Sequence, residues 1–390
     1  MGRYLRNLNE AFRKGDLVLL FLCIVTTAFG CLVIASTTSQ TGSLRHVIIQ
    51  IIAAMLGVFL YVVVSSVDAE FFAEHRSTLV IFNTVLLLML IPFGTDNNTG
   101  NKSWLEFPFL PFNIQPAEIC KISYILIMAS VMNAHQNRIS SIPSVSHMVL
   151  HLGLLVGMNM VLSGDAGVSL IFVFIFIGMA FAGGVSLIWF LVGAGGIAAA
   201  FPILWTYIMD DYQRRRIEVL FNPDLDPLGI DARYHTVRSL RSLTGGGMTG
   251  QGLFDGHRTQ MEGSLYAQHT DYIFSAIGEE LGFVGCALVL VMMVIIIARI
   301  IWVGNRSQDY MRRLICFGAA SAMIFQVLVN TGMCMGLTPV IGLTLPFISY
   351  GGSSIVTLYA MLGLVSGVYA RPAATSHERY IRPPYAQHHL

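Results

Sequence analysis

Long runs of apolar residues constrain this chain more than any other feature. Ten of them approach the roughly 20 residues that a helix needs to cross a bilayer. Hydrophobic residues make up 55% of the chain and charged residues only 12%, which excludes an ordinary soluble globular protein. The expected spans are 17–37, 47–67, 78–94, 116–134, 145–162, 166–183, 185–208, 281–301, 312–335 and 348–370. The sequence therefore predicts an all-α polytopic membrane protein with ten transmembrane helices.

The basic residues predict how these spans are oriented, because short loops rich in Lys and Arg stay in the cytoplasm. Such residues lie in 1–16, in 371–390 and between the eighth and ninth spans. We therefore expect two cytoplasmic tails, 1–16 and 371–390, around a ten-span membrane domain, 17–370. The connection at about 209–280, between the seventh and eighth spans, is then the one large external loop.

Polar residues inside membrane spans are costly, so they mark candidate functional positions. In "QPAEICKI", Glu118 and Lys121 are three residues apart and share one helix face. The pair either neutralises itself at the bilayer edge or offers its ammonium group to an anion. In "LSGDAGVSL", Asp165 lies between glycines, where it either caps the next helix or meets a metal ion or a sugar hydroxyl.

The external loop carries many positive charges beside the membrane surface. Its arginines include Arg214, Arg215, Arg216, Arg233, Arg238, Arg241 and Arg258. Such side chains either attract anionic lipid headgroups or bind phosphate through their guanidinium forks. A glycine run follows at Gly245–Gly247, Gly250, Gly252 and Gly256. It indicates either a flexible loop or backbone N–H groups that approach an anion.

The stretch "AQHTDYIFSAIGEELGFVG" contains three carboxylates around an apolar heptapeptide. Because the continuous apolar run starts at Leu281, we expect "YIFSAIG" to be an interfacial or re-entrant segment outside the eighth span. Glu279 and Glu280 would then mark the mouth of that span, where the helix dipole favours acidic side chains. Asp271 remains as a carboxylate facing the arginine-rich loop, and it is our candidate general base.

The segment "LTPVIGLTLPFISYGGSS" before the last span is rich in proline and glycine. Irregular backbone at membrane depth is tolerated where protein buries it or where it lines a watery cavity, so we expect a cavity wall. One base beside cations suits displacement of a pyrophosphate, since only the attacking hydroxyl must lose a proton. If the pyrophosphate leaves from a sugar, a direct displacement of this kind would invert the configuration of the sugar carbon that is attacked.

Four motifs in the same order resemble the SEDS family of bacterial membrane proteins, of the RodA, FtsW and SpoVE types, slightly nearer the RodA type. They are "NKSWLEFPFLPFNIQPAEICKI", "LTGGGMTGQGLFDG", "QHTDYIFSAIGEELGFVG" and "GLTPVIGLTLPFISYGGSS". The resemblance implies an inverting peptidoglycan glycosyltransferase for cell elongation, cell shape or division. Such an enzyme polymerises lipid II at the outer face of the cytoplasmic membrane and releases undecaprenyl pyrophosphate.

The resemblance also implies the site residues. Asp271 matches the essential aspartate of the family's His-Thr-Asp motif. By motif, the expected residues for binding substrate and pyrophosphate are Trp104, Glu118, Lys121, Asp165, His269, Ser349 and Ser353. The loop residues Arg214, Arg216 and Arg258 are added to them because their guanidinium groups can bind phosphate. Where the family has Leu-Pro-Glu before this motif, the chain has "LYAQ", which argues against a second carboxylate there; Glu262 is the acidic residue nearby in sequence.

The implied partners are lipid II, the growing lipid-linked glycan strand, a class B penicillin-binding protein and other membrane proteins of the cell-wall machinery, with no nucleic acid. No metal ligands are assigned, and a requirement for Mg²⁺ or Mn²⁺ is left open. Two other functions are considered, a lipid II flippase and a non-catalytic scaffold. The polar groups cluster at the outer edge and not at the midplane, where transporter sites tend to lie, which favours the enzyme.

Overall fold

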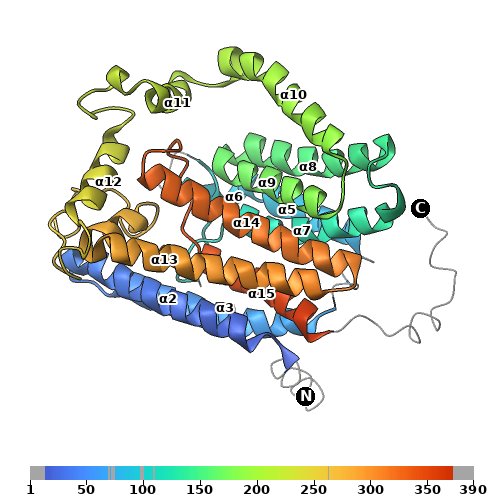
Figure 1. Ribbon diagram of the computed structural model, residues 1–390, viewed down its shortest axis with the longest axis horizontal. Coiled ribbons are helices and arrows are strands. Elements are labelled where there is room, and N and C mark those ends of the chain that lie inside the picture. The colour runs from blue at the N-terminus through green and yellow to red at the C-terminus, as the bar shows by residue number, and fades with distance from the viewer. Residues whose placement is uncertain are drawn as a thin grey trace.

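Long apolar helices run side by side through the protein and form the bundle in Figure 1. The computed structural model describes residues 14–68, 71, 75–96, 101–108, 110–261 and 263–371. Nine helices in these ranges are long and apolar enough to cross a membrane, and the apolar helix α9 (Ala166–Ala182) falls just below that length. The all-α polytopic fold is thereby confirmed.

The helices that form the bundle have the following bounds. They are α2 (Leu17–Thr37), α3 (Arg45–Ser66), α5 (Arg76–Leu88), α6 (Leu90–Phe93), α7 (Pro116–Ala134), α8 (Ile142–Ser163), α9, α10 (Leu187–Ile203), α13 (Ile273–Arg306), α14 (Tyr310–Cys334) and α15 (Gly352–Ala370). The long connection at about 209–280, which is predicted to be external and which we call the external loop, contributes α11 (Asp211–Phe221) and α12 (Tyr234–Gly245).

Short elements join the long helices. Three are 3₁₀ turns, η1 (Ser39–Thr41), η2 (Gln136–Arg138) and η4 (Pro223–Leu225), and one is a π-helix, η3 (Leu204–Ile208). Strands β1 (Gly94–Thr95) and β2 (Trp104–Leu105) pair in antiparallel fashion, with Gly94 opposite Leu105. The core centres on α7, α14 and α15. In each of these helices, 78% of the most apolar 18-residue stretch is buried.

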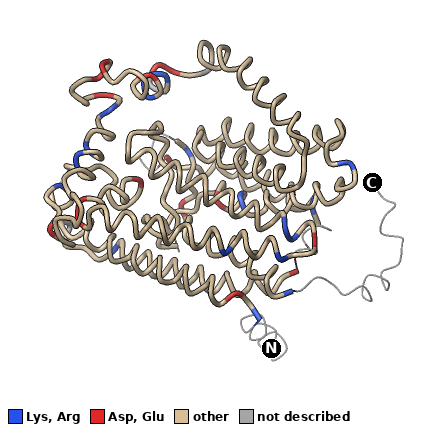
Figure 2. The backbone as a smooth tube through the Cα atoms, viewed as in Figure 1, with Lys and Arg blue, Asp and Glu red and all other residues tan. Residues whose placement is uncertain are grey.

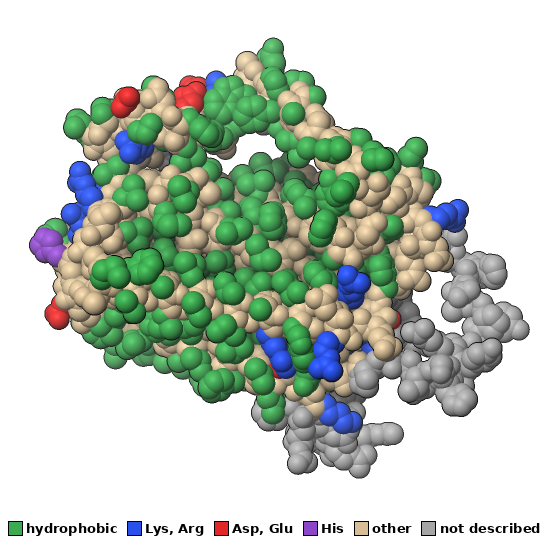
Figure 3. Space-filling model, in the orientation of Figure 1, with side chains coloured by type: hydrophobic (Ala, Val, Ile, Leu, Met, Phe, Trp, Pro, Cys, Tyr) green, Lys and Arg blue, Asp and Glu red, His purple; other side chains and the backbone are tan. Residues whose placement is uncertain are grey.

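The flanks of the bundle are apolar. Figure 3 shows hydrophobic side chains over most of the visible face, and in Figure 2 much of the charge lies near the helix ends and over α11 and α12. Helix α10 has no buried residue and arches away from the bundle in Figure 1. A helix that is hydrophobic all round suits a lipid environment. The chain is a multi-pass membrane protein.

Two ends of the bundle can be distinguished. At one end the backbone N–H of Asp16 donates to Ser366 Oγ at 3.0 Å, which joins the start of α2 to the end of α15. At the other end α7, α9, α13 and α15 begin and α11 and α12 lie nearby, as Figure 1 shows. We call this second end the loop end; the carboxylates of interest lie there.

The eighth span differs most from its prediction, because α13 begins at Ile273 and not at 281. The segment "YIFSAIG" continues into the helix, which breaks at Gly282 (φ 65°). Glu279 and Glu280 lie just before this break, in agreement with the prediction that they precede the long part of the eighth span, but they are 0% and 1% exposed and so do not lie at an open helix mouth. The hydroxyl of Ser36 donates to the Glu280 carboxylate at 2.6–2.7 Å. Donors from distant segments, which no local pattern reveals, allow these carboxylates to be buried.

The glycine run of the external loop forms backbone hydrogen bonds on both sides of the break in α13. The N–H groups of Gln251 and Gly252 donate to the carbonyls of Glu279 and Glu280, each at 3.0 Å. In return, the N–H groups just after the break donate to carbonyls at residues 247 and 248. These bonds satisfy backbone groups that a helix end leaves unpaired. At Gly252 the run therefore binds helix backbone in place of the anion considered from sequence.

This packing predicts a large difference between two neighbouring glycines. A Cβ added at Gly246 would lie 1.9 Å from the carbonyl oxygen of Gly278, whereas one at Gly245 would meet only the flexible Gln251 side chain at 3.3 Å. Overpacking of this kind costs about 1–3 kcal/mol. We expect Gly246→Ala to lower the Tm of the detergent-solubilised protein clearly and Gly245→Ala to change it little. Equal Tm values for the two variants would contradict this packing.

Candidate functional site

Asp271 lies at the loop end, two residues before α13. The helical turns formed by "YIFSAIG" lie between Asp271 and the break at Gly282, so Asp271 lies outside the long part of α13, as the sequence predicted. Its carboxylate is partly buried and accepts no hydrogen bond from the described residues. A Cβ added at Gly342 would lie 3.4 Å from Asp271 Oδ2, so the carboxylate faces the loop before α15. We call residues 338–351 the α15 loop.

The environment of Asp271 makes its carboxylate a stronger base than usual. The pKa is raised to about 6, first because the surroundings exclude water and second because Asp165 carries a like charge. A carboxylate with such a pKa is largely ionised at neutral pH yet accepts a proton more readily than an ordinary aspartate. Asp271 therefore has the properties of a general base.

Asp165 borders the same α15 loop. Of the two roles considered from sequence, the structure shows the helix cap: its Oδ1 accepts from the N–H of Val168 at 3.0 Å. Its Oδ2 accepts from Gln115 Nε2 at 3.1 Å, and burial raises the pKa of the carboxyl group. A Cβ added at Gly167 would lie only 2.6 Å from Ile341 Cγ2. The Asp165 turn and Asp271 thus both adjoin residues 341–343.

The Glu118–Lys121 pair lies deeper, between α7 and α15. Its two charged groups are 2.8 Å apart and the residues are 4% and 3% exposed, so the predicted pairing on one helix face is confirmed. Thr357 Oγ1 donates to the second carboxylate oxygen of Glu118 at 3.0 Å. At the start of the same helices, Gln115 N–H donates to Ser353 Oγ at 3.1 Å. Ser353 thus joins α15 to the segment that also holds Asp165.

The α15 loop also fixes the residues just before Asp271. Ser349 Oγ donates to the carbonyl of Thr270 at 2.6 Å, and Tyr350 N–H donates to the carbonyl of His269 at 2.8 Å. The His269 ring packs 4.9 Å from the ring of His46. Burial, with a smaller contribution from His46, lowers the pKa of His269 to about 4. His269 is therefore a neutral imidazole at physiological pH.

The three predicted loop arginines have different surroundings. Arg216 Nη1 donates to the carbonyl of Val340 at 2.9 Å, which brings this residue to the α15 loop. The backbone N–H of Arg258 donates to Glu279, while its guanidinium makes no hydrogen bond with the described residues. Arg214 instead donates to the carbonyls of Thr206 and Met209, where α10 joins α11. Its carboxylate partner is Asp211 at 3.4 Å, and among the described residues no hydrogen bond or ion pair joins Arg214 to Asp165 or Asp271.

Trp104 lies in β2, beside the Asp165 turn. The hydroxyl of the preceding residue, Ser103, is 2.7 Å from that of Ser163 at the end of α8. The Trp104 carbonyl accepts from Thr95 Oγ1 at 3.3 Å. The strand thus brings the tryptophan to the loop end. Glu262, the other acidic residue considered from sequence, lies outside the described residues.

Two buried polar residues that support the site were missed in the sequence. Gln50 on α3 is 0% exposed; its Nε2 donates to the carbonyl of Ser349 at 3.0 Å and its Oε1 accepts from Gly351 N–H at 3.2 Å. Asn330 on α14 is also 0% exposed and donates to Asp271 and Leu343. Both are isolated polar residues in predicted spans, which is the signal that could have revealed them.

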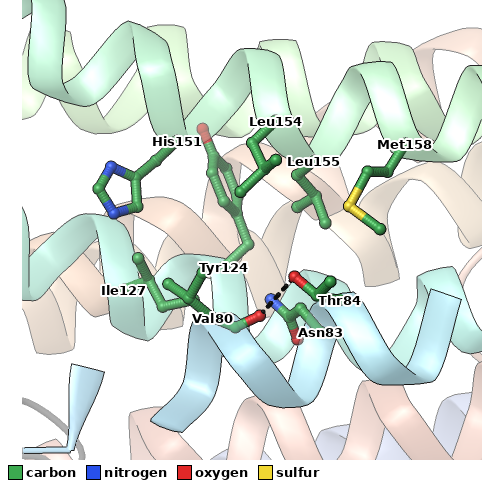
Figure 4. A pocket seen from close by; sticks show the side chains of 9 residues that line it. All are labelled: Val80, Asn83, Thr84, Tyr124, Ile127, His151, Leu154, Leu155 and Met158. Atoms are coloured by element: carbon green, nitrogen blue, oxygen red, sulfur yellow. Dashed lines mark hydrogen bonds between the residues drawn. The ribbon is translucent and has the colours of Figure 1, made fainter. Parts of the chain in front are cut away.

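A separate pocket lies among α5, α7 and α8 (Figure 4). Its lining is Val80, Asn83, Thr84, Tyr124, Ile127, His151, Leu154, Leu155 and Met158. The buried Tyr124 hydroxyl has no hydrogen-bond partner, and Thr84 Oγ1 donates to the carbonyl of Val80 at 2.9 Å. No Lys, Arg, Asp or Glu lines this pocket. Elsewhere in the described chain, no group of three His, Cys, Asp or Glu residues is arranged to hold a metal ion.

The chain resembles proteins of bacterial cell-wall synthesis over almost its whole length. The model of the cell cycle protein family named for FtsW, RodA and SpoVE matches residues 16–372. Peptidoglycan glycosyltransferase MrdB of Escherichia coli K12 is 32% identical over 359 residues, which are 91% of this chain and 93% of that protein. A probable peptidoglycan glycosyltransferase FtsW of Geobacter metallireducens is 33% identical over 380 residues, 95% and 98% of the two chains.

Solved structures show the same fold. One similar chain comes from work on the structural coordination of polymerization and crosslinking by a peptidoglycan synthase complex; its TM-score is 0.76 and its identity 26%, over 94% of this chain and 99% of that one. The rod shape determining protein RodA of Thermus thermophilus has a TM-score of 0.67 and 25% identity, over 91% of this chain and 96% of that one.

Proposed function

Because this chain belongs to the FtsW, RodA and SpoVE family and is a peptidoglycan glycosyltransferase, we propose that it polymerises lipid II with Asp271 as the general base. The observation that carries the proposal is the Asp271 carboxylate itself. It is partly buried, free of hydrogen bonds from the described residues, and has a pKa raised to about 6. A carboxylate used only to stabilise the fold would be expected to accept hydrogen bonds.

The proposed reaction needs one proton transfer. The 4-hydroxyl of the acceptor GlcNAc gives its proton to the Asp271 carboxylate, and its oxygen forms a bond to the anomeric carbon of the lipid-linked donor. The bond from that carbon to the pyrophosphate oxygen breaks, and undecaprenyl pyrophosphate leaves with the electron pair. Because attack and departure occur on opposite faces, the anomeric carbon is inverted.

Cations are needed where the negative charge of the leaving group develops. Lys121 is the buried candidate, because its pair with Glu118 lies on α7 close to the segment that holds Asp165. Arg216 and Arg258 are candidates at the rim, where guanidinium forks can bind phosphate oxygens. Arg214 is left out of the proposed site, since it binds the α10–α11 junction. Trp104, Ser349 and Ser353 remain proposed substrate-binding residues.

The positions of the site residues support the enzyme over the flippase. A site that carries a pyrophosphate through the bilayer needs cations along the path, because an unpaired charge in hydrocarbon is costly. Asp165, His269 and Asp271, three predicted site residues whose pKa values are altered, lie at the loop end. This distribution suits chemistry at one membrane face.

The setting of the enzyme is also proposed. The loop end faces outward from the cytoplasmic membrane and both termini are cytoplasmic, which the basic connections support. A class B penicillin-binding protein supplies crosslinking, supported by the similarity to a chain from a peptidoglycan synthase complex. The need for Mg²⁺ or Mn²⁺ is a question for the assay below.

Purified protein and labelled lipid II test this proposal. The protein in detergent, with and without a penicillin-binding partner whose transpeptidase is inactivated, should form a linear glycan polymer. The reaction should be run with Mg²⁺, with Mn²⁺ and with a chelator. Polymer formation supports the enzyme. Lipid II translocation in vesicles without any polymer would favour the flippase, and neither activity in the complete complex would favour the scaffold.

Asp165 offers a test through pH. Its negative charge helps to raise the pKa of Asp271, so Asp165→Asn should lower that pKa and move the acid limb of the polymerisation rate to lower pH. Asparagine caps helices about as well as aspartate, which keeps the α9 start intact. The measurement is kcat/KM against pH for both proteins. An acid limb that stays in place or moves to higher pH would contradict the proposed coupling.

A further inference from the structure

Asn330 joins the two irregular segments that flank the proposed active site. It lies one turn before the end of α14 and is 0% exposed. Its Nδ2 donates to the carbonyl of Asp271 at 2.9 Å and to the carbonyl of Leu343 at 2.6 Å. A side-chain amide has two N–H donors. Both are thus used to join the turn that bears Asp271 to the α15 loop.

Packing alone does not account for this residue. Asn330 Oδ1 is buried and has no hydrogen-bond partner. An unpaired buried acceptor costs about 1–3 kcal/mol, so a leucine at this position would avoid that cost. A leucine could not donate to either carbonyl, however. The value of asparagine here therefore lies in the two hydrogen bonds that it donates.

The same construction recurs at the second aspartate. Asn159 lies one turn before the end of α8 and is 0% exposed. Its Nδ2 donates to the carbonyl of Asp165 and to Ser169 Oγ, each at 2.9 Å, and its Oδ1 also has no partner. In both cases a rigid helix that ends at the loop end holds the backbone of an aspartate through a buried asparagine.

We infer that Asn330 is a positioning residue for the glycosyl transfer reaction: it fixes the backbone of Asp271 relative to the α15 loop and so sets the direction of the carboxylate. This inference rests on the proposed function of Asp271. Asn330 acts through the backbone and does not touch the substrate. Small displacements matter here, since a shift of about 1 Å in a catalytic group can cost roughly 10²-fold in rate.

The test compares Asn330→Leu with Gln326→Leu. Gln326 lies one turn earlier on α14, is 1% exposed, and makes no hydrogen bond to Asp271 or Leu343. Both changes place leucine in the same helix, but only the first releases Asp271. For Asn330→Leu we expect kcat to fall by about 10- to 100-fold with a much smaller change in KM. Gln326→Leu should remain within a few-fold of wild type.

The pH profile distinguishes positioning from a purely structural role. A released Asp271 is better solvated, so its pKa should fall from about 6 and the acid limb should move to lower pH. Gln326→Leu should leave the limb unchanged. Asn330→Gln, which keeps two N–H donors on a longer side chain, should recover part of the lost kcat relative to Asn330→Leu.

The outcomes separate this inference from the proposed function. If Asp271→Asn, measured in parallel, polymerises lipid II normally, the proposed function fails. If Asp271→Asn is inactive but folded Asn330→Leu matches Gln326→Leu in kcat and pH profile, the positioning role is overturned. If Asn330→Leu does not fold, the smaller Asn330→Ser is assessed by the same criteria. Failure of both to fold would assign Asn330 to folding alone and would also overturn the inference.

Discussion

Asp271→Asn should reduce the rate of glycan polymerisation by about 10²- to 10⁴-fold, the range that a positioned general base contributes. Asparagine has nearly the same shape as aspartate and leaves the backbone carbonyl free to accept from Asn330. An amide cannot take a proton from the attacking hydroxyl, so the loss should fall on kcat while KM changes little. The measurement is the initial rate of polymer formation from labelled lipid II by the complex with its penicillin-binding partner.

The matched control for this variant is Asp224→Asn. Asp224 is an exposed acidic residue of the same external loop, in η4, and the substitution removes the same charge. It should leave the rate within a few-fold of wild type. If folded Asp271→Asn and Asp224→Asn polymerise lipid II at equal rates, Asp271 is not the general base.

The second large effect concerns stability. Lys121→Met removes the cation from the buried pair, leaving the Glu118 carboxylate at 4% exposure without its ammonium partner. Breaking a buried ion pair by removing one member costs about 3–5 kcal/mol. We therefore expect a large drop in the Tm of the detergent-solubilised protein.

Arg215→Gln is the control for the Lys121 variant. Arg215 pairs with Asp231 at 2.9 Å, but their side chains are 65% and 59% exposed. Exposed pairs of this kind contribute about 0–1 kcal/mol. The Tm should therefore hardly change. A Lys121→Met protein as stable as Arg215→Gln would contradict the burial of the pair.

The double variant Glu118→Gln/Lys121→Met separates stability from function. Removing both charges avoids the cost of an unpaired buried carboxylate, so much of the lost Tm should return. If Lys121 also stabilises the departing pyrophosphate, polymerisation should remain low in the double variant. Full recovery of the rate together with the Tm would assign the pair to the fold and not to the reaction.

Hydropathy predicted the spans well because burial in lipid is a local property of a segment. The bounds of α2 and α7 agree with their predicted runs. The start of α13 could not be found in this way, since Glu279 and Glu280 were taken as the membrane boundary. Their carboxylates accept hydrogen bonds from Ser36 and from Arg258 of the external loop, which lie far away in sequence. Local patterns do not contain such contacts.

The site was predictable where chemistry is carried by a motif or a helix position. The Asp165 cap and the Glu118–Lys121 pair follow from spacing along the chain, and both have the predicted geometry. The sequence could not show which of the loop arginines lies at the site, because any of them can bind phosphate. Only the fold shows that Arg216 reaches the α15 loop while Arg214 does not.

The pH dependence of polymerisation tests the central claim most directly, namely that Asp271 is the general base. We predict that kcat/KM of the wild-type complex rises with pH through the Asp271 pKa of about 6 and then levels off. The residual rate of Asp271→Asn should lack this rise. A wild-type rate that is flat from about pH 5 to pH 8, or an unchanged acid limb in Asp271→Asn, would contradict the account.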